Sequence, residues 1–223
     1  MKLILADCLD VLRTMLENSV DVAITDPPYN VGKAYNSHDD SMPEDEYVAW
    51  MQDVYRELGR VCDSVVFFPG TRRFLQTNEF LAKSDLSVRR ILGWHKREFA
   101  GDLWSGGPAM CWEPVVWAAT SESPYYNKIF GTWGRDFFVV DATHGDEARA
   151  VHPCPKPLLV MRWLVNLFCP EDGTVLDPFM GTGRTGVACV IQSRGFVGIE
   201  KDPVYFAYAE RQIDAVAAQG VLL

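Results

Sequence analysis

Short apolar runs alternate with longer amphipathic segments along most of the chain. Buried strands are typically short apolar runs between turn-forming residues, and this pattern predicts strands at 2–5, 21–25, 63–68, 88–94, 114–119, 174–177 and 196–199. Apolar residues that recur every three or four positions predict helices at 8–17, 44–60, 72–83, 157–168, 184–193 and 203–218. Strands that alternate with helices favour an α/β fold, in which a mostly parallel sheet is covered by helices on both faces.

Seven strands with their helices around one core would use up a chain of 223 residues, so residues 1–223 are expected to form one domain. Two segments, 97–112 and 120–152, break the regular pattern and are rich in Gly, Trp, Tyr and Pro. Long irregular segments inside a compact domain usually carry function. We therefore expect binding residues in these two segments.

Composition narrows the class of protein. Hydrophobic residues make up 48% of the chain, which is typical of a folded soluble protein. The apolar runs are too short to span a bilayer, and the apolar start before Asp7 is too short for a secretory signal, so we expect a cytoplasmic protein without a membrane partner. The six cysteines share no CxxC spacing and the four histidines form no paired ligand motif, so no metal site is expected.

The charge is negative and uneven. The formal net charge of −9 argues against a simple nucleic-acid binder, because phosphate contacts need cations. Residues 72–98 nevertheless hold seven bases and three acids. This segment forms either a basic binding face or an ordinary solvated surface. The acidic run at 39–46 is expected to be a helix N-terminus with solvated charges.

A glycine-rich turn follows the strand predicted at 174–177. Its sequence DPFMGTGRTG places Gly181, Gly183 and Gly186 in a GxGxxG pattern, and Glu200 ends the next predicted strand. This is the layout of a nucleotide-binding βαβ unit, in which the glycines let the backbone approach the ligand and the acid binds ribose hydroxyls. The turn therefore predicts an adenosine-type cofactor.

The residues between strand and glycines indicate which cofactor. In dinucleotide sites the first glycine follows the strand at once, so that pyrophosphate meets the helix N-terminus. Here Asp-Pro-Phe-Met intervenes, and Asp177 would repel a pyrophosphate. A ligand with an ammonium group and no phosphate suits this turn, and S-adenosylmethionine (SAM) is such a ligand.

A second motif, ITDPPYN at 24–30, ends the strand predicted at 21–25. Asp26 and the carbonyl of Pro27 are placed to accept hydrogen bonds from an exocyclic amino group, which turns its lone pair toward a methyl donor. Pro27 and Pro28 stiffen the loop because each fixes its own φ, and such positioning raises the rate. Tyr29 offers a ring on which a base flipped out of the duplex can stack.

At this point the chain resembles the permuted β class of amino-directed DNA methyltransferases, a family with a Rossmann-like SAM-dependent fold. In that family the DPPY motif comes first and the cofactor glycine motif last, as they do here. The likeness includes LADCLDVL at 5–12, HPCPKP at 152–157 and IEKDP at 199–203. DPPY in place of SPPY implies transfer to adenine N6.

The resemblance implies roles for individual residues. Asp26, Pro27, Pro28 and Tyr29 would be catalytic, and the cofactor would be bound by Asp7, Lys156, Asp177, Phe179, Gly181, Gly183, Glu200 and Asp202. This chain has Cys154-Pro155 where most relatives carry Thr-Gln. The resemblance also implies DNA as partner, a homodimer, and a short target-recognition insertion at about 120–150. The candidate DNA-contacting side chains in that insertion are Tyr125, Tyr126, Lys128, Trp133, Arg135 and Arg149.

Three alternatives stay open at the level of sequence. The same chemistry suits cytosine N4, or an amino group in RNA or a protein amide. A nicotinamide-dependent oxidoreductase would use the glycine pattern, although the DPFM insertion argues against it. A non-catalytic SAM-fold subunit that helps a partner bind DNA would not need an intact DPPY motif.

Overall fold

The computed structural model describes residues 1–33, 35–36, 40–96, 111–129, 131–141 and 147–219, so most of the irregular segment 97–112 and residues 142–146 lie outside the described residues. The described strands form one eight-stranded sheet in the order β1-β8-β7-β2-β3-β5-β4-β6. The strands are β1 (Lys2–Leu5), β2 (Val22–Thr25), β3 (Ser64–Phe67), β4 (Ser87–His95), β5 (Trp112–Ala119), β6 (Phe137–Val139), β7 (Thr174–Asp177) and β8 (Gly195–Glu200).

The expected α/β architecture is confirmed, with one correction to the number of strands. All seven predicted strands form, and β6 is an eighth that the pattern missed, because its three residues are too few to show an alternation. Neighbouring strands from β1 through β8, β7 and β2 to β3 are parallel, and only β5 runs against its neighbours β3 and β4.

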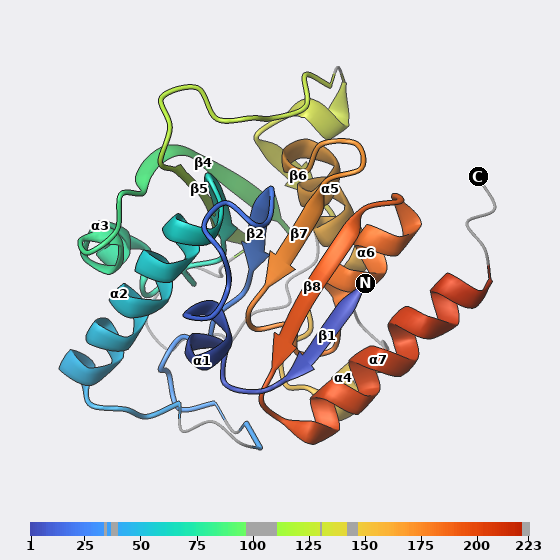
Figure 1. Ribbon diagram of the computed structural model, residues 1–223, viewed down its shortest axis with the longest axis horizontal. Coiled ribbons are helices and arrows are strands. Elements are labelled where there is room, and N and C mark those ends of the chain that lie inside the picture. Colours follow the sequence, from blue (N-terminus) through green and yellow to red (C-terminus); the bar gives the residue numbers. More distant parts are fainter. Residues whose placement is uncertain (34, 37–39, 97–110, 130, 142–146, 220–223) are drawn as a thin grey trace.

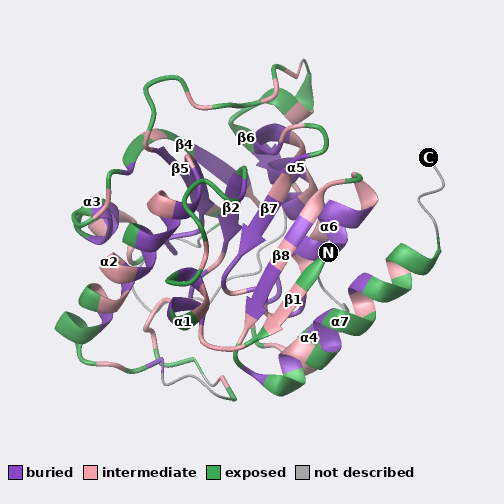
Figure 2. Ribbon diagram, in the orientation of Figure 1, coloured by how far each residue is buried: buried purple, intermediate pink, exposed green. Residues whose placement is uncertain are grey.

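Helices cover both faces of the sheet (Figure 1). The helices are α1 (Cys8–Leu12), α2 (Glu44–Val61), α3 (Thr77–Leu81), α4 (Ala148–Val151), α5 (Leu158–Phe168), α6 (Arg184–Ile191) and α7 (Pro203–Ala218), with short 3₁₀ turns η1 (Phe74–Gln76) and η2 (Thr132–Gly134). Helices α1, α2 and α3 pack on one face, and α5, α6 and α7 pack on the other. In Figure 2 the central strands β2 and β7 are mostly in the colour of buried residues, whereas β1 is not.

Strand β2 shows how the pattern produces the two cores. Its residues are all buried, and successive side chains point to opposite faces. Val22 and Ile24 therefore join the core under α5 and α6, whereas Ala23 joins the core under α2. A strand buried on both faces reads as a continuous apolar run, which is why the sequence identifies it.

Two predicted helices are shorter than expected. The helix expected at 8–17 ends at Leu12. The Arg60 guanidinium donates one hydrogen bond to the carbonyl of Leu12, 2.7 Å away, and another to the carbonyl of Met15, 2.8 Å away. These carbonyls therefore have a partner without a continued helix. The helix expected at 72–83 divides into η1 and α3. In both places a distant side chain or a tighter turn overrides local helix propensity.

No described helix is long and apolar enough to cross a membrane. Among the described residues, no three His, Cys, Asp or Glu side chains gather closely enough to hold a metal ion.

The contact between α6 and α7 depends on the absence of a side chain at Gly183. This residue has φ +77°, and a Cβ built there would lie 2.8 Å from the Ala209 Cβ and 3.0 Å from its Cα. We expect Gly183→Ala to lower the free energy of unfolding by about 1–3 kcal/mol more than Gly32→Ala does, because overpacking adds to the strain of positive φ.

Urea unfolding of both variants measures this difference. Gly32 is the matched control because it also has positive φ, +75°, but no atom of the described residues lies within 4 Å of the place that its added methyl carbon would take. Equal losses in the two variants would show that the α6–α7 contact relaxes freely around an added methyl group.

Candidate active site

Four acidic residues gather where four neighbouring parallel strands end. Asp7 follows β1, Asp26 follows β2, Asp177 is the last residue of β7, and Glu200 is the last residue of β8. The carboxyl ends of parallel strands share one edge of the sheet, and ligands of open α/β sheets bind there. All four residues line a single cavity of about 940 Å³, a volume that includes its mouth open to solvent.

This cavity unites the two motifs that the sequence separates. Asp26 and Pro28 come from the DPPY loop, and Phe179 and Gly181 come from the glycine turn, yet all line the same cavity. Lys156 also lines it, from the HPCPKP segment. Because β7 and β2 are neighbours in the sheet, the loops that follow them meet although most of the chain lies between them.

Glu200 organises the turn at the β8 end of the cavity. Its carboxylate accepts hydrogen bonds from the backbone N–H of Gly181 at 2.9 Å and of Asp202 at 2.8 Å. Burial raises the pKa of this carboxyl, and the two backbone hydrogen bonds oppose the rise. Each carboxylate oxygen keeps a further lone pair, which suits a ribose hydroxyl.

Asp177 ties the glycine turn to the neighbouring strand. It is 3% exposed, and its carboxylate accepts hydrogen bonds from the hydroxyls of Thr25 at 2.8 Å and Thr185 at 2.6 Å and from the Phe179 N–H at 3.1 Å. Burial raises its pKa to about 6. Much of the function of Asp177 is therefore to fix the shape of the turn.

The two motif glycines differ in what they approach. Gly181 lines the cavity and has φ +50°, and a Cβ there would make only an ordinary contact, 3.5 Å from the His152 Nε2, so the positive φ is what favours glycine. Gly183 instead permits the approach of α7 and does not line the cavity. His152 accepts a hydrogen bond at Nδ1 from the Cys154 N–H, and burial lowers its pKa to about 4, so its ring is neutral.

Two of the predicted cofactor acids cap helices. Asp7 accepts a hydrogen bond from the Leu9 N–H at 2.9 Å and begins α1, and it also lines the cavity. Asp202 accepts from the N–H groups of Val204 and Tyr205 and begins α7, and it does not line the cavity. Asp202 therefore acts on the site through the placement of α7.

An aromatic pair borders the cavity near Asp7. The rings of Trp50 and Phe179 meet edge to face, with their centroids 5.6 Å apart, and both residues line the cavity. Phe179 was expected from the sequence, whereas Trp50 was not. Trp50 lies on α2 among apolar residues that share its helical spacing, so only the fold distinguishes it from the core residues of that helix.

The DPPY loop is held rigidly by side chains from outside it. The Tyr47 hydroxyl donates to the Pro28 carbonyl at 2.8 Å, and the Arg73 guanidinium donates to the carbonyls of Tyr29 and Asn30 at 3.0 and 3.1 Å. Among the described residues, none donates to the carbonyl of Pro27. This carbonyl remains an available acceptor inside a fixed loop.

Asp26 has a partner on each carboxylate oxygen. Oδ1 accepts a hydrogen bond from the Tyr29 hydroxyl, and Oδ2 lies 2.8 Å from the Lys156 Nζ. The Tyr29 ring packs beneath Gly70, where a Cβ would lie 3.0 Å from the ring, and Tyr29 is not one of the residues that line the cavity. In this arrangement Tyr29 fixes the orientation of the Asp26 carboxylate.

Asp40 is a residue of the site that the sequence did not identify. It is 2% exposed, and its carboxylate accepts the backbone N–H groups of Asn30, Val31 and Lys33 at 2.8, 3.0 and 2.9 Å. Asp40 thereby pins the chain that follows the DPPY loop. In the sequence it stands in an acidic run whose later members, at 44–46, do form the expected first turn of α2.

The basic segment at 72–98 does not form one continuous basic face in its described part. Arg73 turns inward to the DPPY loop, and Lys96 is 7% exposed and paired with Glu113. Arg90 is exposed but paired with Asp136, 3.0 Å away. Arg73 and Lys96 are therefore used inside the molecule, whereas Arg72, Lys83 and Arg90 remain exposed.

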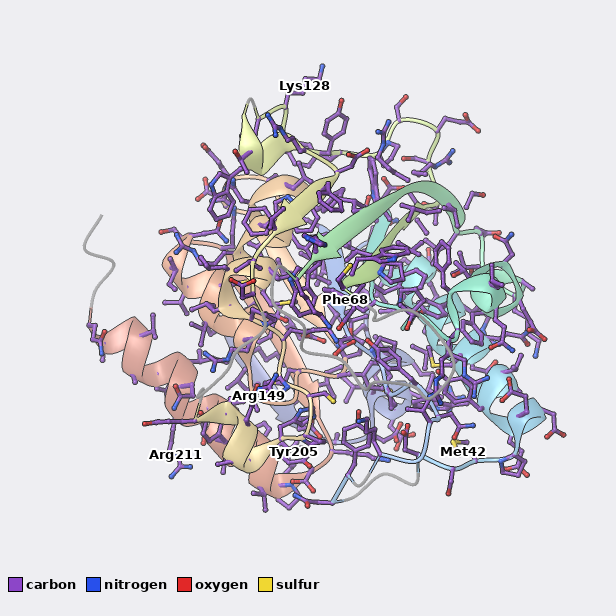
Figure 3. The ribbon with its side chains drawn as sticks, turned by 180° about the vertical axis from the view of Figure 1, so that it is seen from behind. Met42, Phe68, Lys128, Arg149, Tyr205 and Arg211 are labelled. Atoms are coloured by element: carbon purple, nitrogen blue, oxygen red, sulfur yellow. The ribbon has the colours of Figure 1, made fainter. Side chains whose placement is uncertain are left out.

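The segment expected to recognise the target divides between two edges of the sheet. Strand β5 is antiparallel to β3, so residues 120–129, which follow it, lie at the edge opposite the cavity, where Tyr125, Tyr126 and Lys128 are found. Figure 3 shows Lys128 at the end of the molecule away from Tyr205 and Met42. Trp133 packs on Phe138 in the core, with ring centroids 5.4 Å apart.

Fold and cavity together define a Rossmann-like enzyme with an adenosine-type cofactor site. Residues 20–130 and 116–211 match the family model N6_N4_Mtase, DNA methylase. The chain belongs to this family of DNA methylases. The resemblance drawn from its motifs is thereby confirmed at the level of the family.

Relatives match along almost the whole chain. Type II methyltransferase M.HpaI of Haemophilus parainfluenzae is 25% identical over 96% of this chain and 74% of its own length. DNA adenine methyltransferase YhdJ of Escherichia coli (strain K12) is 23% identical over 95% of this chain and 82% of its own length.

Solved structures share the fold. The crystal structure of the M1.HpyAVI–SAM complex has a TM-score of 0.72 and 23% identity and covers 96% of this chain and 98% of its own. The cytosine-N4-specific PvuII DNA methyltransferase has a TM-score of 0.74 and 16% identity over 97% of this chain and 91% of its own. At these identities the two structures establish the fold.

The raised pKa of Asp177 predicts a pH dependence of stability. A carboxyl whose pKa is near 6 in the folded state and near 4 in the unfolded state favours folding at low pH, and that contribution is lost as pH rises through 6. From pH 5 to pH 7, we expect the wild type to lose about 1 kcal/mol of unfolding free energy that Asp177→Asn does not lose.

Urea unfolding at pH 5, 6 and 7 measures this difference. Asp85→Asn serves as the control, because Asp85 is exposed. Parallel pH profiles of wild type and Asp177→Asn would contradict the assignment.

Proposed function

We propose that this protein transfers a methyl group from SAM to the N6 amino group of adenine in DNA. The observation that carries the proposal is the single cavity lined by Asp26 and Pro28 at one end and by Gly181 and Glu200 at the other. Such a cavity holds an amino group beside a methyl donor, and membership of the DNA methylase family supports DNA as the substrate.

The residues of the cavity fit SAM. SAM carries an ammonium group and a sulfonium but no phosphate, which matches an edge lined by Asp7, Asp177 and Glu200. Glu200 is placed for the ribose hydroxyls. Trp50 and Phe179 offer apolar ring surface for the adenine. SAM supplies an activated methyl group, and the chain supplies its placement.

The chemistry needs acceptors for an amino group. The N6 lone pair is delocalised into the purine ring, so it attacks well only when hydrogen bonds to both amino hydrogens turn it out of the ring plane. Asp26 and the Pro27 carbonyl supply those acceptors. As the N–C bond forms, the C–S bond breaks, the sulfur keeps the electron pair, and the nitrogen loses one proton to Asp26 or to water.

The base must leave the duplex before it reaches this loop, because its amino group is paired there. Of the segment 120–150, the part after β6 is the better candidate for DNA contact. Strand β6 is parallel to β4, so it ends at the edge of the cavity, and the chain continues from there to His152. Arg149, on α4, belongs to this part.

Adenine is preferred over cytosine because the motif is DPPY and because the relative YhdJ is named as an adenine methyltransferase. Cytosine N4 is the second candidate, since a cytosine-N4-specific enzyme shares the fold. We expect DNA incubated with methyl-labelled SAM and the protein to yield labelled N6-methyl-2′-deoxyadenosine after digestion to nucleosides. Label in N4-methyl-2′-deoxycytidine would assign the second candidate, and label in neither would overturn the proposal.

Asp26→Ala provides the control for this assay. We expect it to reduce transfer at least about 10³-fold, because an acceptor placed for the transition state is lost, and to leave the SAM dissociation constant within about twofold. Asp85→Ala, on an exposed acid, should retain full activity. Equal loss of SAM binding and transfer in Asp26→Ala would contradict the assigned role.

We further propose a homodimer, on the strength of the family resemblance and of the low positive charge available for DNA. Light scattering on the purified protein should then give twice the mass of 25.1 kDa. A monomer that methylates DNA at full rate would contradict a need for the second subunit.

A further inference from the structure

Glu113 is a largely enclosed carboxylate beside the site that the proposed reaction does not use. It lies near the start of β5, which runs against β3, so it stands at the same edge of the sheet as the cavity. Its carboxylate pairs with the Lys96 ammonium on one oxygen and lies 3.4 Å from the Lys156 Nζ on the other. The side chains of both lysines are 9% exposed, and that of Glu113 is 18% exposed.

Lys156 has no spare donor in this arrangement. Its ammonium carries three N–H groups, and three acceptors surround it: Asp26 Oδ2 at 2.8 Å, the Tyr29 hydroxyl at 3.1 Å and Glu113 Oε2 at 3.4 Å. It also lies 4.8 Å from the centroid of the ring of Phe68, which is labelled near the centre of Figure 3. Lys156 therefore faces the catalytic loop, although the family resemblance implied a cofactor role.

The two acids and two lysines form a charge-balanced row, Asp26–Lys156–Glu113–Lys96. Buried ions are tolerated only when opposite charges and hydrogen bonds replace water, so removing one member leaves another uncompensated. The row crosses from the DPPY loop to β5 and to Lys96, the residue that follows β4. It gives the Asp26 carboxylate a fixed anchor on the sheet.

We propose that Glu113 and Lys156 are positioning residues of the methyl transfer, in which Glu113 holds the Lys156 ammonium and Lys156 orients the Asp26 carboxylate and keeps it ionised. This inference rests on the proposed function, because it concerns the acceptor of that reaction. Nothing in the motifs marks Glu113, which stands alone before Pro114 in the sequence.

The electrostatics of the row agree with this role. Burial raises the pKa of Asp26, and the Lys156 charge and hydrogen bond oppose that rise. The carboxylates hold the pKa of Lys156 well above its usual range in spite of burial, so it stays an ammonium. The titratable groups that face Asp26 are Tyr29, Tyr35, Tyr47, Tyr55, Glu113, Lys156 and Asp177. Lys156 is the one cation in this described set.

Lys156→Met tests the first link. Without the ammonium the pKa of Asp26 rises, so the acid limb of the kcat–pH profile should move up by about one unit or more. We expect kcat at pH 7 to fall about 10–100-fold, as a misplaced acceptor would cause, with KM for SAM within about twofold. Lys83→Met, on an exposed lysine, is the control. A large rise in the KM for SAM would instead assign Lys156 to the cofactor and overturn the proposal.

Glu113→Gln tests the second link and has a different signature. It removes a negative charge near Asp26, so the acid limb should not move up, yet kcat should fall about tenfold because Lys156 loses its support. Glu171→Gln, on an exposed acid, is the control. Unchanged kcat in Glu113→Gln would overturn the positioning role.

A balanced double variant separates positioning from simple folding. Lys96→Met with Glu113→Gln removes both members of the Lys96–Glu113 pair, so Lys96 is not left as an unpaired buried charge. We expect it to retain the stability of the wild type more closely than Glu113→Gln and to keep the tenfold loss of kcat. Wild-type kcat in the double variant would show that Glu113 serves only to neutralise Lys96, which would overturn the proposal.

A measurement without substrate keeps this inference distinct from the proposed function. Carboxyl ¹³C NMR of aspartate-labelled protein, with the Asp26 signal assigned by its loss in Asp26→Asn, gives the pKa of Asp26 directly. We expect a higher pKa in Lys156→Met than in wild type. If the wild type methylates no DNA but the pKa of Asp26 rises in Lys156→Met, the proposed function is wrong and the role of Lys156 in the row is supported. If DNA is methylated and the pKa of Asp26 is the same in both proteins, only the role of the row is wrong.

Discussion

The contact between the Lys156 ammonium and the Asp26 carboxylate is the interaction on which the site depends. It joins the loop after β2 to the segment that leads into α5, and it places a charge where burial alone would favour a neutral carboxyl. An ionised carboxylate only accepts hydrogen bonds, whereas a neutral carboxyl also donates one, so in the proposed reaction this contact favours the form of Asp26 that accepts from an amino group. Three further side chains fix the backbone of the loop. Tyr47 and Arg73 donate hydrogen bonds to its carbonyls, and Asp40 accepts hydrogen bonds from the N–H groups that follow the loop.

The sheet brings these parts together through strand order. Strands β1, β8, β7 and β2 are parallel neighbours, so the residues that follow them meet at one edge although they come from both ends of the chain. Strand β5 runs antiparallel to β3, and this direction has two consequences. It carries Glu113 to that same edge at the start of the strand, and it carries residues 120–129 to the opposite edge at the end of the strand. The same topology that brings Glu113 to the cavity edge therefore places the first part of the expected recognition segment, residues 120–129, at the other edge.

Particular elements show what was predictable from the sequence. The buried strands β2 and β7 are continuous apolar runs, and α7 begins at an Asp-Pro pair that is a strong start signal, so each was predicted within a residue or two. Strand β6 was missed because three residues carry no period. Helix α1 ends early where Arg60, 48 positions from Leu12, donates a hydrogen bond to its last carbonyl. The motif residues Asp26, Pro28, Gly181 and Glu200 line one cavity, whereas Asp40, Trp50 and Glu113 gave no signal of their own in the sequence.

By itself, the sequence determined the α/β class, the family and the two motifs, because periodicity and short motifs are local properties that can be recognised from the order of the residues alone. Tertiary structure alone decided that Lys156 contacts Asp26, and that Glu113 lies between Lys156 and Lys96. It also decided that Tyr125 and Lys128 lie far from the cavity. These are relations between charges and surfaces distant in the chain, and their energies depend on burial and on separation in space. A lone glutamate before a proline looks the same in the sequence whether it is solvated or enclosed between two ammonium groups, and only the fold supplies that enclosure.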